Sequence, residues 1–367
     1  MMAMLEEICA INMGQSPDSS TYNEDGNGLP FFQGNADFGE IYPAVRMWCS
    51  EPTKIAREKD ILISVRAPIG ALNIANCECC IGRGLAALTV NEDICAQEYL
   101  WHALSGKVDE LNSKGTGSTF KAINKKTLSE TEIPLPPIDE QRKIAAILDK
   151  VSDLIAKSRQ QLDKLDEMVK ARFVEMFGDP QNNEKNWKMR TFKEICTVRQ
   201  GLQIPISKRL THFEENCYEY ITVAYLHGAK DKEYIKNPKS TVICTKDDVL
   251  MTRTGNTGMV ITNVAGVFHN NFFLIDFDRD KYIKEFLVEY LNLDLIQTEL
   301  KKRAGTSTIP DLNHSEFYKI AIYEPQMDLQ NQFAAFVNQT EKSKITISRS
   351  LEKLETLKKA LMQEYFG

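Results

Sequence analysis

The sequence predicts a mixed α/β protein built as a tandem duplication, in which two strand-rich units are each followed by a long helix. Five motifs recur in the same order at an offset that drifts from 187 to 189 residues. Apolar residues also repeat with helical spacing over two extended segments, one central and one at the end of the sequence. With 367 residues, the chain is too long for one typical domain.

The internal repeat is carried by five pairs of segments. Residues 5–9, 60–66, 114–124, 137–141 and 175–178 recur as 192–196, 248–254, 303–313, 326–330 and 364–367. Gly70 is also matched by Gly258, whereas residues 22–49 have no recognisable counterpart in 218–242. A shared framework with divergent inserts predicts a duplicated unit that reads two different targets.

Each half begins with a strand-rich part. Short β-branched or alternating runs bounded by Gly, Asn and Pro predict strands. These runs are 61–65, 85–90, 220–223, 249–252, 259–264 and 272–277. Helical patterns are expected near 97–111 and 282–302.

A long helix is predicted after each strand-rich part. Prolines followed by Asp139 and Glu140 suit a helix start, and a helix over 139–177 would be about 58 Å long at 1.5 Å per residue. Steps of four and three define an apolar seam: Ile144, Leu148, Val151, Ile155, Ser158, Leu162, Leu165, Val169, Arg172 and Met176. The same steps 189 residues later give Phe333, Val337, Thr340, Lys344, Ile347, Leu351, Leu354, Lys358, Leu361 and Tyr365. This is coiled-coil patterning.

The two seams are expected to cover each other, because an apolar stripe of this length is unfavourable in water. Only residues 178–187 separate the first helix from the second strand-rich part. This short link favours antiparallel helices and a dumbbell with an approximate twofold axis. The polar seam residues, such as Ser158 and Lys344, either fix the register or meet a partner, or they simply extend their polar groups to water.

Composition and charge limit the class of protein. The net charge of −6 argues against a protein that holds any polyanion by bulk charge. Nine cysteines, an odd number in a chain of this size, predict reduced core thiols and a cytoplasmic location. No run approaches the roughly 18 apolar residues of a membrane helix, so no membrane association is expected.

A family resemblance supports this interpretation. The run IPLPPIDEQRKIAAILDKVSDLIAKSRQQLDKL (133–165), closed by EMFGDP (175–180), resembles the central conserved region of DNA specificity subunits of type I restriction–modification systems. Residues 14–17, 28–34, 60–70 and 82–88 resemble target recognition domains of that family, and the second such domain matches more loosely at 248–258 and 305–308.

The resemblance implies a domain organisation and partners. It implies target recognition domains over 1–135 and 179–324, and conserved helices over 136–178 and 325–367. It also implies a non-catalytic subunit that binds a bipartite, asymmetric target on double-stranded DNA. Two methyltransferase subunits would dock on the helices, and restriction and translocase subunits would join the full complex.

Candidate DNA contacts are residues of the types that read bases or bind phosphates, placed in loops. They are Gln33, Arg66, Arg83, Lys114, Thr116, Ser118 and Lys121 in the first half, and Gln200, Gln203, Lys208, Arg209, Arg253, Asn256, Arg303, Thr306 and Ser307 in the second. Each of them has an alternative interpretation as a solvated loop residue.

Apparent catalytic signals fail on inspection, so neither a cofactor nor a metal is expected. Gly82-Arg83-Gly84 lacks the third glycine of a dinucleotide-binding turn, and the thiols of 77–80 lack a second ligand pair. The five histidines are isolated in the sequence. Two other hypotheses remain: a coiled-coil scaffold whose heads bind other proteins, and an enzyme in its own right.

Overall fold

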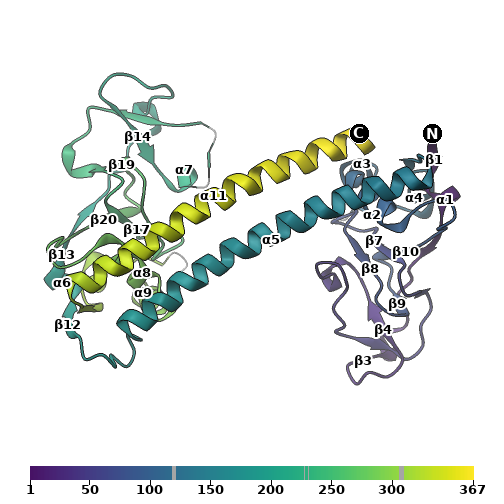
Figure 1. The fold of residues 1–367 in the computed structure, drawn as a ribbon, viewed down its shortest axis with the longest axis horizontal. Coiled ribbons are helices and arrows are strands. Elements are labelled where there is room, and N and C mark those ends of the chain that lie inside the picture. The colour runs from purple at the N-terminus through teal and green to yellow at the C-terminus, as the bar shows by residue number, and fades with distance from the viewer. Residues whose placement is uncertain (118–120, 227, 230, 306–309) are drawn as a thin grey trace. The chain divides into compact units, whose positions relative to one another are not determined.

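The computed structural model describes residues 1–117, 121–226, 228–229, 231–305 and 310–367 (Figure 1). The chain divides into two compact units. Unit 1 consists of Met1–Arg159 and Arg349–Gly367, and unit 2 consists of Gln160–Ser348. The two long helices, α5 (Ile138–Phe177) and α11 (Met327–Phe366), each contribute one part to each unit.

Unit 1 is built on two sheets and a two-stranded ribbon. The antiparallel sheet has the order β2-β10-β7-β8, with strands β2 (Cys9–Met13), β7 (Ile61–Ser64), β8 (Leu72–Ile74) and β10 (Leu85–Val90). The second sheet has the order β3-β5-β4-β9-β6, with β3 (Tyr22–Asn23), β4 (Leu29–Phe32), β5 (Trp48–Cys49), β6 (Ile55–Ala56) and β9 (Cys79–Ile81). The ribbon pairs β1 (Met2–Met4) with β11 (Glu132–Pro134). The short helices are α1 (Leu5–Ile8), α2 (Gln97–Gly106), α3 (Val108–Ser113) and α4 (Lys125–Ser129), with 3₁₀ turns η1 (Ser19–Thr21) and η2 (Asn35–Asp37).

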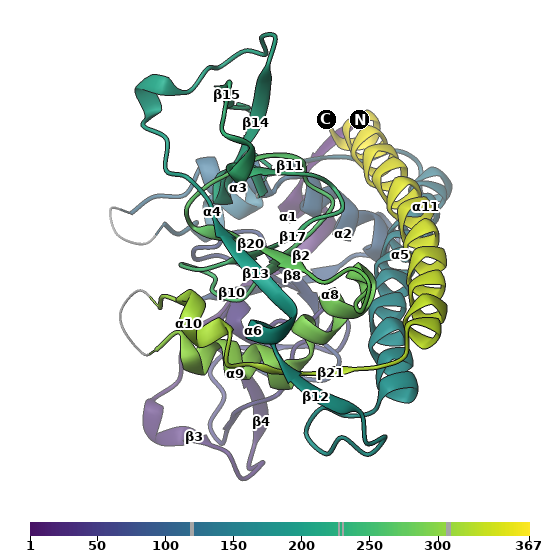
Figure 2. The same ribbon diagram turned by 90° about the vertical axis from the view of Figure 1, so that its left-hand side faces the viewer.

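Unit 2, which faces the viewer in Figure 2, follows the same plan, with four strands in its second sheet instead of five. Its antiparallel sheet has the order β13-β20-β17-β18, with β13 (Cys196–Gln200), β17 (Val249–Thr252), β18 (Val260–Ile261) and β20 (Phe272–Phe277). Its second sheet has the order β15-β14-β19-β16, with β14 (Cys217–Ile221), β15 (Tyr234–Lys236), β16 (Ile243–Cys244) and β19 (Gly266–Phe268). The ribbon pairs β12 (Lys188–Thr191) with β21 (Ala321–Glu324). The short helices are α6 (Phe192–Ile195), α7 (Val223–Leu226), α8 (Lys284–Asn292), α9 (Asp294–Arg303) and α10 (His314–Phe317), with η3 (Ile206–Lys208) and η4 (Ser240–Val242).

The duplication predicted from the sequence is therefore confirmed, and it extends further than the motifs indicated. Strands β4 and β14, from the regions without sequence similarity, also have equivalent partners: β4 pairs in parallel with β9, and β14 pairs in parallel with β19. On the other side of β9, strand β6 pairs antiparallel, and β16 pairs with β19 in the same manner. The pairing pattern is shared although the residues differ, because a strand requires only a buried face and free backbone groups.

Several predicted elements have different limits. Strands β10, β17 and β20 match their predicted ranges, but the helices predicted over 97–111 and 282–302 are each broken into two. The first break follows Gly106, a residue that favours helix termination, and the second lies at Leu293, whose backbone is extended. Strand β18 is shorter than predicted because Asn263 has a positive φ of 60°.

The long helices form close to their predicted limits, and every predicted seam residue is buried or half-buried. Ile144, Leu148, Val151, Ile155, Val169 and Phe333 are buried, and Leu162, Leu165, Val337, Ile347, Leu351, Leu354 and Leu361 are half-buried. The seam prediction missed Phe173 and Phe177, which are both fully buried in unit 2.

The helices lie side by side and antiparallel within each unit (Figure 1). In unit 1, the beginning of α5 packs against the end of α11, and Arg159 forms an ion pair with Glu355 at 2.6 Å. In unit 2, the end of α5 packs against the beginning of α11, and Lys344 forms an ion pair with Asp166 at 2.5 Å. The polar seam residue Lys344 is thus neutralised by a carboxylate of the facing helix.

A buried glutamine fastens each long helix to its own unit. The Gln141 side chain accepts a hydrogen bond from Ala96 N (2.9 Å) and donates to Ile94 O (3.1 Å) and Pro136 O (2.8 Å). Gln330 repeats this arrangement with Ile283 N, Lys281 O and Pro325 O. The recurrence of residues 137–141 at 326–330 therefore has a structural cause: one side-chain amide satisfies three backbone groups that are buried or partly buried.

The nine cysteines are free thiols, eight of them buried and Cys77 half-buried, which agrees with the predicted core role. Burial raises the pKa of Cys9 and Cys196 to about 12, so these thiols stay protonated. Within the described part of the chain, no helix is long and apolar enough to cross a membrane, and no cluster of His, Cys, Asp or Glu could hold a metal ion.

Candidate nucleic-acid interface

In unit 1, the structure brings five predicted DNA-contacting residues onto one continuous set of loops. Gln33, Arg66, Arg83, Thr116 and Lys121 are all exposed. We call them the unit 1 loop surface.

Backbone hydrogen bonds join these loops. Gly84 N donates to Gln33 O (3.2 Å), and Val65 N donates to Gly84 O (2.9 Å). Ala67 N then donates to Lys121 O (3.0 Å). Ala122 also exchanges two hydrogen bonds with Thr116. The loop surface is therefore held by main-chain bonds, which leave the side chains free to meet a ligand.

The glycines on either side of Arg83 allow close backbone contact. A Cβ atom at Gly84 would lie 2.5 Å from Gln33 O, and one at Gly82 would lie 3.0 Å from Gln33 Cα. Position 84 therefore requires glycine for packing against the loop that carries Gln33, and a side chain at position 82 would fit only if that loop shifted slightly. This explains the Gly-Arg-Gly sequence without a nucleotide site.

Three cations of the unit 1 loop surface are electrostatically uncompensated. Among the described residues, Arg66, Arg83 and Lys121 form no ion pair. Lys114, just outside this surface, contacts Glu110 at 2.6 Å, and this hydrogen bond lowers the pKa of Glu110. Lys114 is therefore the candidate cation of unit 1 that is already neutralised.

An equivalent turn carries the candidate residues of both units. The Ser64 hydroxyl donates to Pro68 O (2.7 Å) and accepts from Ala71 N (2.9 Å). In unit 2, the Thr252 hydroxyl donates to Asn256 O and accepts from Met259 N (2.8 Å). Arg66 and Arg253 both lie within this turn, just after the corresponding strands β7 and β17.

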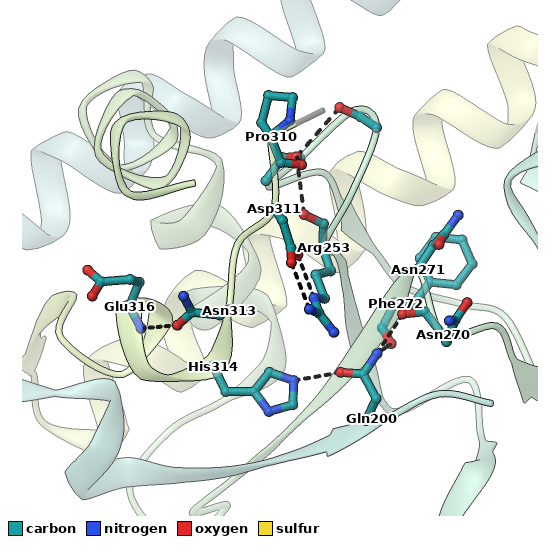
Figure 3. A network of polar contacts seen from close by, with 12 residues as sticks. Gln200, Arg253, Asn270, Asn271, Phe272, Pro310, Asp311, Asn313, His314 and Glu316 are labelled. Carbon is teal, nitrogen blue, oxygen red and sulfur yellow. Dashed lines mark hydrogen bonds and ion pairs between the residues drawn. The ribbon is translucent and has the colours of Figure 1, made fainter. Parts of the chain in front are cut away.

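The Gln200 amide is fully engaged within unit 2 (Figure 3). Its Nε2 donates to Asn270 O (2.5 Å) and to Phe272 O (3.4 Å), while its Oε1 contacts His314 Nε2 at 2.7 Å. An amide oxygen only accepts, so this contact assigns the proton to His314 Nε2. Gln200 thereby orients His314 and has little remaining capacity to read a base.

Arg253 is held by Asp311 at the centre of the same network (Figure 3). Its Nε lies 2.5 Å from Asp311 Oδ1 and its Nη2 lies 2.7 Å from Asp311 Oδ2. This paired hydrogen bond raises the pKa of Arg253, so the guanidinium is always charged. Burial, followed by the charge of Arg253, lowers the pKa of His314, which therefore favours the neutral form.

The other two candidate arginines of unit 2 are also occupied. Arg209 contacts Glu233 at 2.9 Å, donates to Ile204 O, and lies over the ring of Tyr220. Arg303 contacts Glu299 at 2.6 Å and Glu316 at 3.4 Å. Both side chains fasten loops or helices of unit 2.

The remaining candidates of unit 2 divide into two groups. Gln203, Lys208 and Asn256 are exposed. Ser118 of unit 1, together with Thr306 and Ser307 of unit 2, lies outside the described residues.

The sequence predictions missed Asp311, His314 and Asn270. Asp311 lies inside the repeated segment 303–313, at the position of Ala122 in unit 1. A charged residue that is present in only one copy of the repeat was the signal that could have identified it. The contact of His314 with Gln200 joins residues that are 114 positions apart, and no local pattern reveals it.

The chain thus consists of two homologous α/β units, each of which contains part of both long helices. A family model, the type I restriction modification DNA specificity domain, matches residues 1–167 and 184–359. The chain belongs to this family.

Individual relatives match parts of the chain. The putative type I restriction enzyme MjaX specificity subunit of Methanocaldococcus jannaschii is 44% identical over 165 residues, which are 45% of this chain and 39% of the relative. The MjaIX specificity subunit of the same organism is 30% identical over 183 residues, 45% of this chain and 42% of the relative. The matched segments thus span about two fifths of the length of these relatives.

The whole fold has a solved counterpart. The S subunit of a type I restriction–modification system from M. genitalium matches with a TM-score of 0.66 at 15% identity, covering 100% of this chain and 96% of that one. At this identity, the similarity concerns the fold alone.

Proposed function

We propose that the chain is the DNA-reading, non-catalytic subunit of a type I restriction–modification enzyme. Each unit would bind one half of a bipartite, asymmetric target on double-stranded DNA. The observation that carries the proposal is the duplication: the two units have the same arrangement of two sheets and a ribbon, yet they differ in the residues that their loops present. Membership of the specificity-domain family supports it.

The unit 1 loop surface suits DNA because its free cations can bind phosphates and its amide can reach a base edge. Arg66, Arg83 and Lys121 lie on loops joined by main-chain hydrogen bonds, so they can be presented together. Such a local basic surface would compensate for a net charge of −6.

Helices α5 and α11 would set the separation of the half-sites and dock two methyltransferase subunits, with restriction and translocase subunits added in the full complex. A straight helix of 40 residues is about 60 Å long. Several apolar side chains of these helices, including Ile147, Leu154, Val174 and Ile345, are exposed, which suits contact with other subunits. The proposal also implies a cytoplasmic location, where cellular DNA is accessible.

Footprinting of the chain assembled with the modification subunits of its host tests the proposal. We expect two protected segments separated by an indifferent spacer. One continuous protected segment, or equal competition by duplexes of any sequence, would contradict it, and the second result would favour a scaffold whose heads bind proteins.

Charged substitutions in the seam test the role of the helices. Leu162→Glu together with Leu351→Glu should abolish binding to the bipartite target, while each unit separately keeps its hydrogen-exchange protection. Both side chains are half-buried, so glutamates at these positions would disrupt the helix pair. Unchanged binding to the bipartite target would refute a role of the helices in spacing.

A further inference from the structure

The guanidinium of Arg253 presents one free edge. Its Nε and Nη2 face the carboxylate of Asp311, which leaves both hydrogens of Nη1 and the second hydrogen of Nη2 available. Among the described residues, Nη1 makes no hydrogen bond, and the side chain is 33% exposed. The free edge is a pair of parallel donors, the geometry that matches O6 and N7 of guanine.

The backbone holds this edge in place. Arg253 N donates to Asn271 O (2.7 Å), and Leu312 N donates to Arg253 O (3.0 Å). Asp311 is bridged to Thr254, the residue that follows Arg253. The arginine and its carboxylate therefore stand on two paired segments, and less side-chain entropy is lost when a ligand binds.

The surroundings distinguish Arg253 from Arg303, another candidate arginine of unit 2. Figure 3 shows its guanidinium between Asp311 and the Gln200–His314 pair. The neutral His314 adds no competing positive charge. Arg303, by contrast, spends Nε and Nη2 on Glu299 and Nη1 on Glu316, and so retains no free pair of donors.

Unit 1 has no counterpart of this pair. The positions equivalent to Arg253 and Asp311 are Val65 and Ala122, as the shared hydrogen bonds show: Ile123 N donates to Val65 O, and Leu312 N donates to Arg253 O. The Arg253–Asp311 pair is therefore specific to unit 2.

We propose that Arg253 reads a guanine in the half-site bound by unit 2 and that Asp311 is its positioning residue. This inference rests on the proposed DNA-reading function and makes it specific. Arg253 donates through its free edge to O6 and N7 in the major groove. Asp311 fixes the plane of the guanidinium and, by its negative charge, disfavours simple phosphate binding at the same place.

Selection from duplexes of randomised sequence tests the inference. The full chain, assembled with the modification subunits of its host, is used as the wild type and with Arg253→Lys. The wild type should enrich a bipartite motif. Arg253→Lys keeps the charge but loses the fork, and it should reduce the preference for one guanine in one half-site by about 5- to 150-fold. The other half-site should be unchanged.

Asp311→Asn supplies a second readout that a purely structural ion pair would not give. Removing the carboxylate should weaken the preference for the same guanine while strengthening binding to random DNA, because a negative charge leaves the surface. Arg190→Lys is the matched control, because Arg190 is an ion-paired arginine of the same unit that lies outside the candidate DNA contacts, and this variant should leave the motif intact.

Each other outcome has a separate meaning. Arg253→Lys with an unchanged motif overturns the inference, as does equal weakening on all sequences after either substitution, which would indicate a phosphate contact. A wild-type assembly that enriches no motif overturns the proposed function itself. If Arg253→Lys fails to fold, an unchanged motif with Asp311→Asn still contradicts the inference.

Discussion

Arg66 of unit 1 and Arg253 of unit 2 leave equivalent strands, yet their charges are treated differently. Arg66, Arg83 and Lys121 form no ion pair among the described residues, whereas Arg209, Arg253 and Arg303 each contact a carboxylate of their own unit. A cation without an ion pair can bind a phosphate in many orientations. A guanidinium whose plane is fixed by a carboxylate can donate to one pair of acceptors only. The same duplicated framework can therefore present a surface of unpaired cations in one unit and a surface of ion-paired arginines in the other.

The packing of the long helices also differs between the two units. At the end of α5, the ring of Phe173 packs against the rings of Phe177, Phe286, Tyr290 and Phe333 in unit 2. The equivalent position on α11 is Met362, which is half-buried beside unit 1. At this position, the long helix therefore buries more aromatic surface against unit 2 than against unit 1.

The largest predicted difference comes from truncating these two residues. Phe173→Ala should destabilise unit 2 by about 3–5 kcal/mol, while Met362→Ala should destabilise unit 1 by less than about 2 kcal/mol, because only the phenylalanine leaves a fully enclosed cavity. Hydrogen exchange resolved by unit measures both effects. Equal losses would show that the aromatic cluster does not distinguish the units.

Truncating the buried glutamines should instead affect the units equally. Gln141→Ala and Gln330→Ala each leave three buried or partly buried backbone groups without this partner, and each should cost about 1–3 kcal/mol in its own unit. The exposed Gln160 and Gln339 of the same helices are matched controls, with no expected loss. A large effect in one unit alone would contradict an equivalent anchoring role.

Removing a free cation should change the salt dependence of DNA binding. Arg83→Ala should lower the slope of log affinity against log salt by about 0.9 if the side chain binds one phosphate. Arg209→Ala should loosen unit 2 without changing the slope, since its guanidinium is occupied by Glu233 and Ile204. Titration of a random duplex at several salt concentrations gives both slopes, and equal slope changes would remove the distinction between free and occupied cations.

Mild acid should destabilise unit 2 slightly more than unit 1. Burial lowers the pKa of His269 and His314 in unit 2, and of His102 in unit 1, from the ordinary value of 6.5. Below that value the unfolded chain takes up more protons than the folded one, so stability falls as the pH falls.

Hydrogen exchange at about pH 7.5 and about pH 6 compares the two units, after correction for intrinsic exchange rates. His314→Gln should reduce the acid sensitivity of unit 2. An unchanged sensitivity in that variant would exclude His314 as a cause.

Much of the fold followed from periodicity. The strands at 85–90, 249–252 and 272–277 and the helix that begins near Asp139 were predictable because their patterns are local and continuous. The breaks at Gly106 and Leu293 were not predicted, since the apolar spacing continues across them. The shared parallel pairing of β4 and β14 was also missed, because strand pairing depends on residues far apart in the chain.

In the candidate site, too, local features could be predicted and contacts between distant residues could not. Residue type and loop position identified Arg66, Arg83, Lys121 and Arg253, but sequence alone could not separate free cations from occupied ones. That separation depends on contacts such as Arg253 with Asp311, 58 positions away, and Gln200 with His314, 114 positions away.

The duplication, the two long helices and the residue types of the candidate DNA contacts can be predicted from the amino-acid sequence, because each depends on local spacing or on repetition. Folding then determines which of those side chains are free, which form ion pairs and which stabilise the framework. The physical reason is that a hydrogen bond or an ion pair depends on distance in space, and folding sets that distance between segments with no local relation.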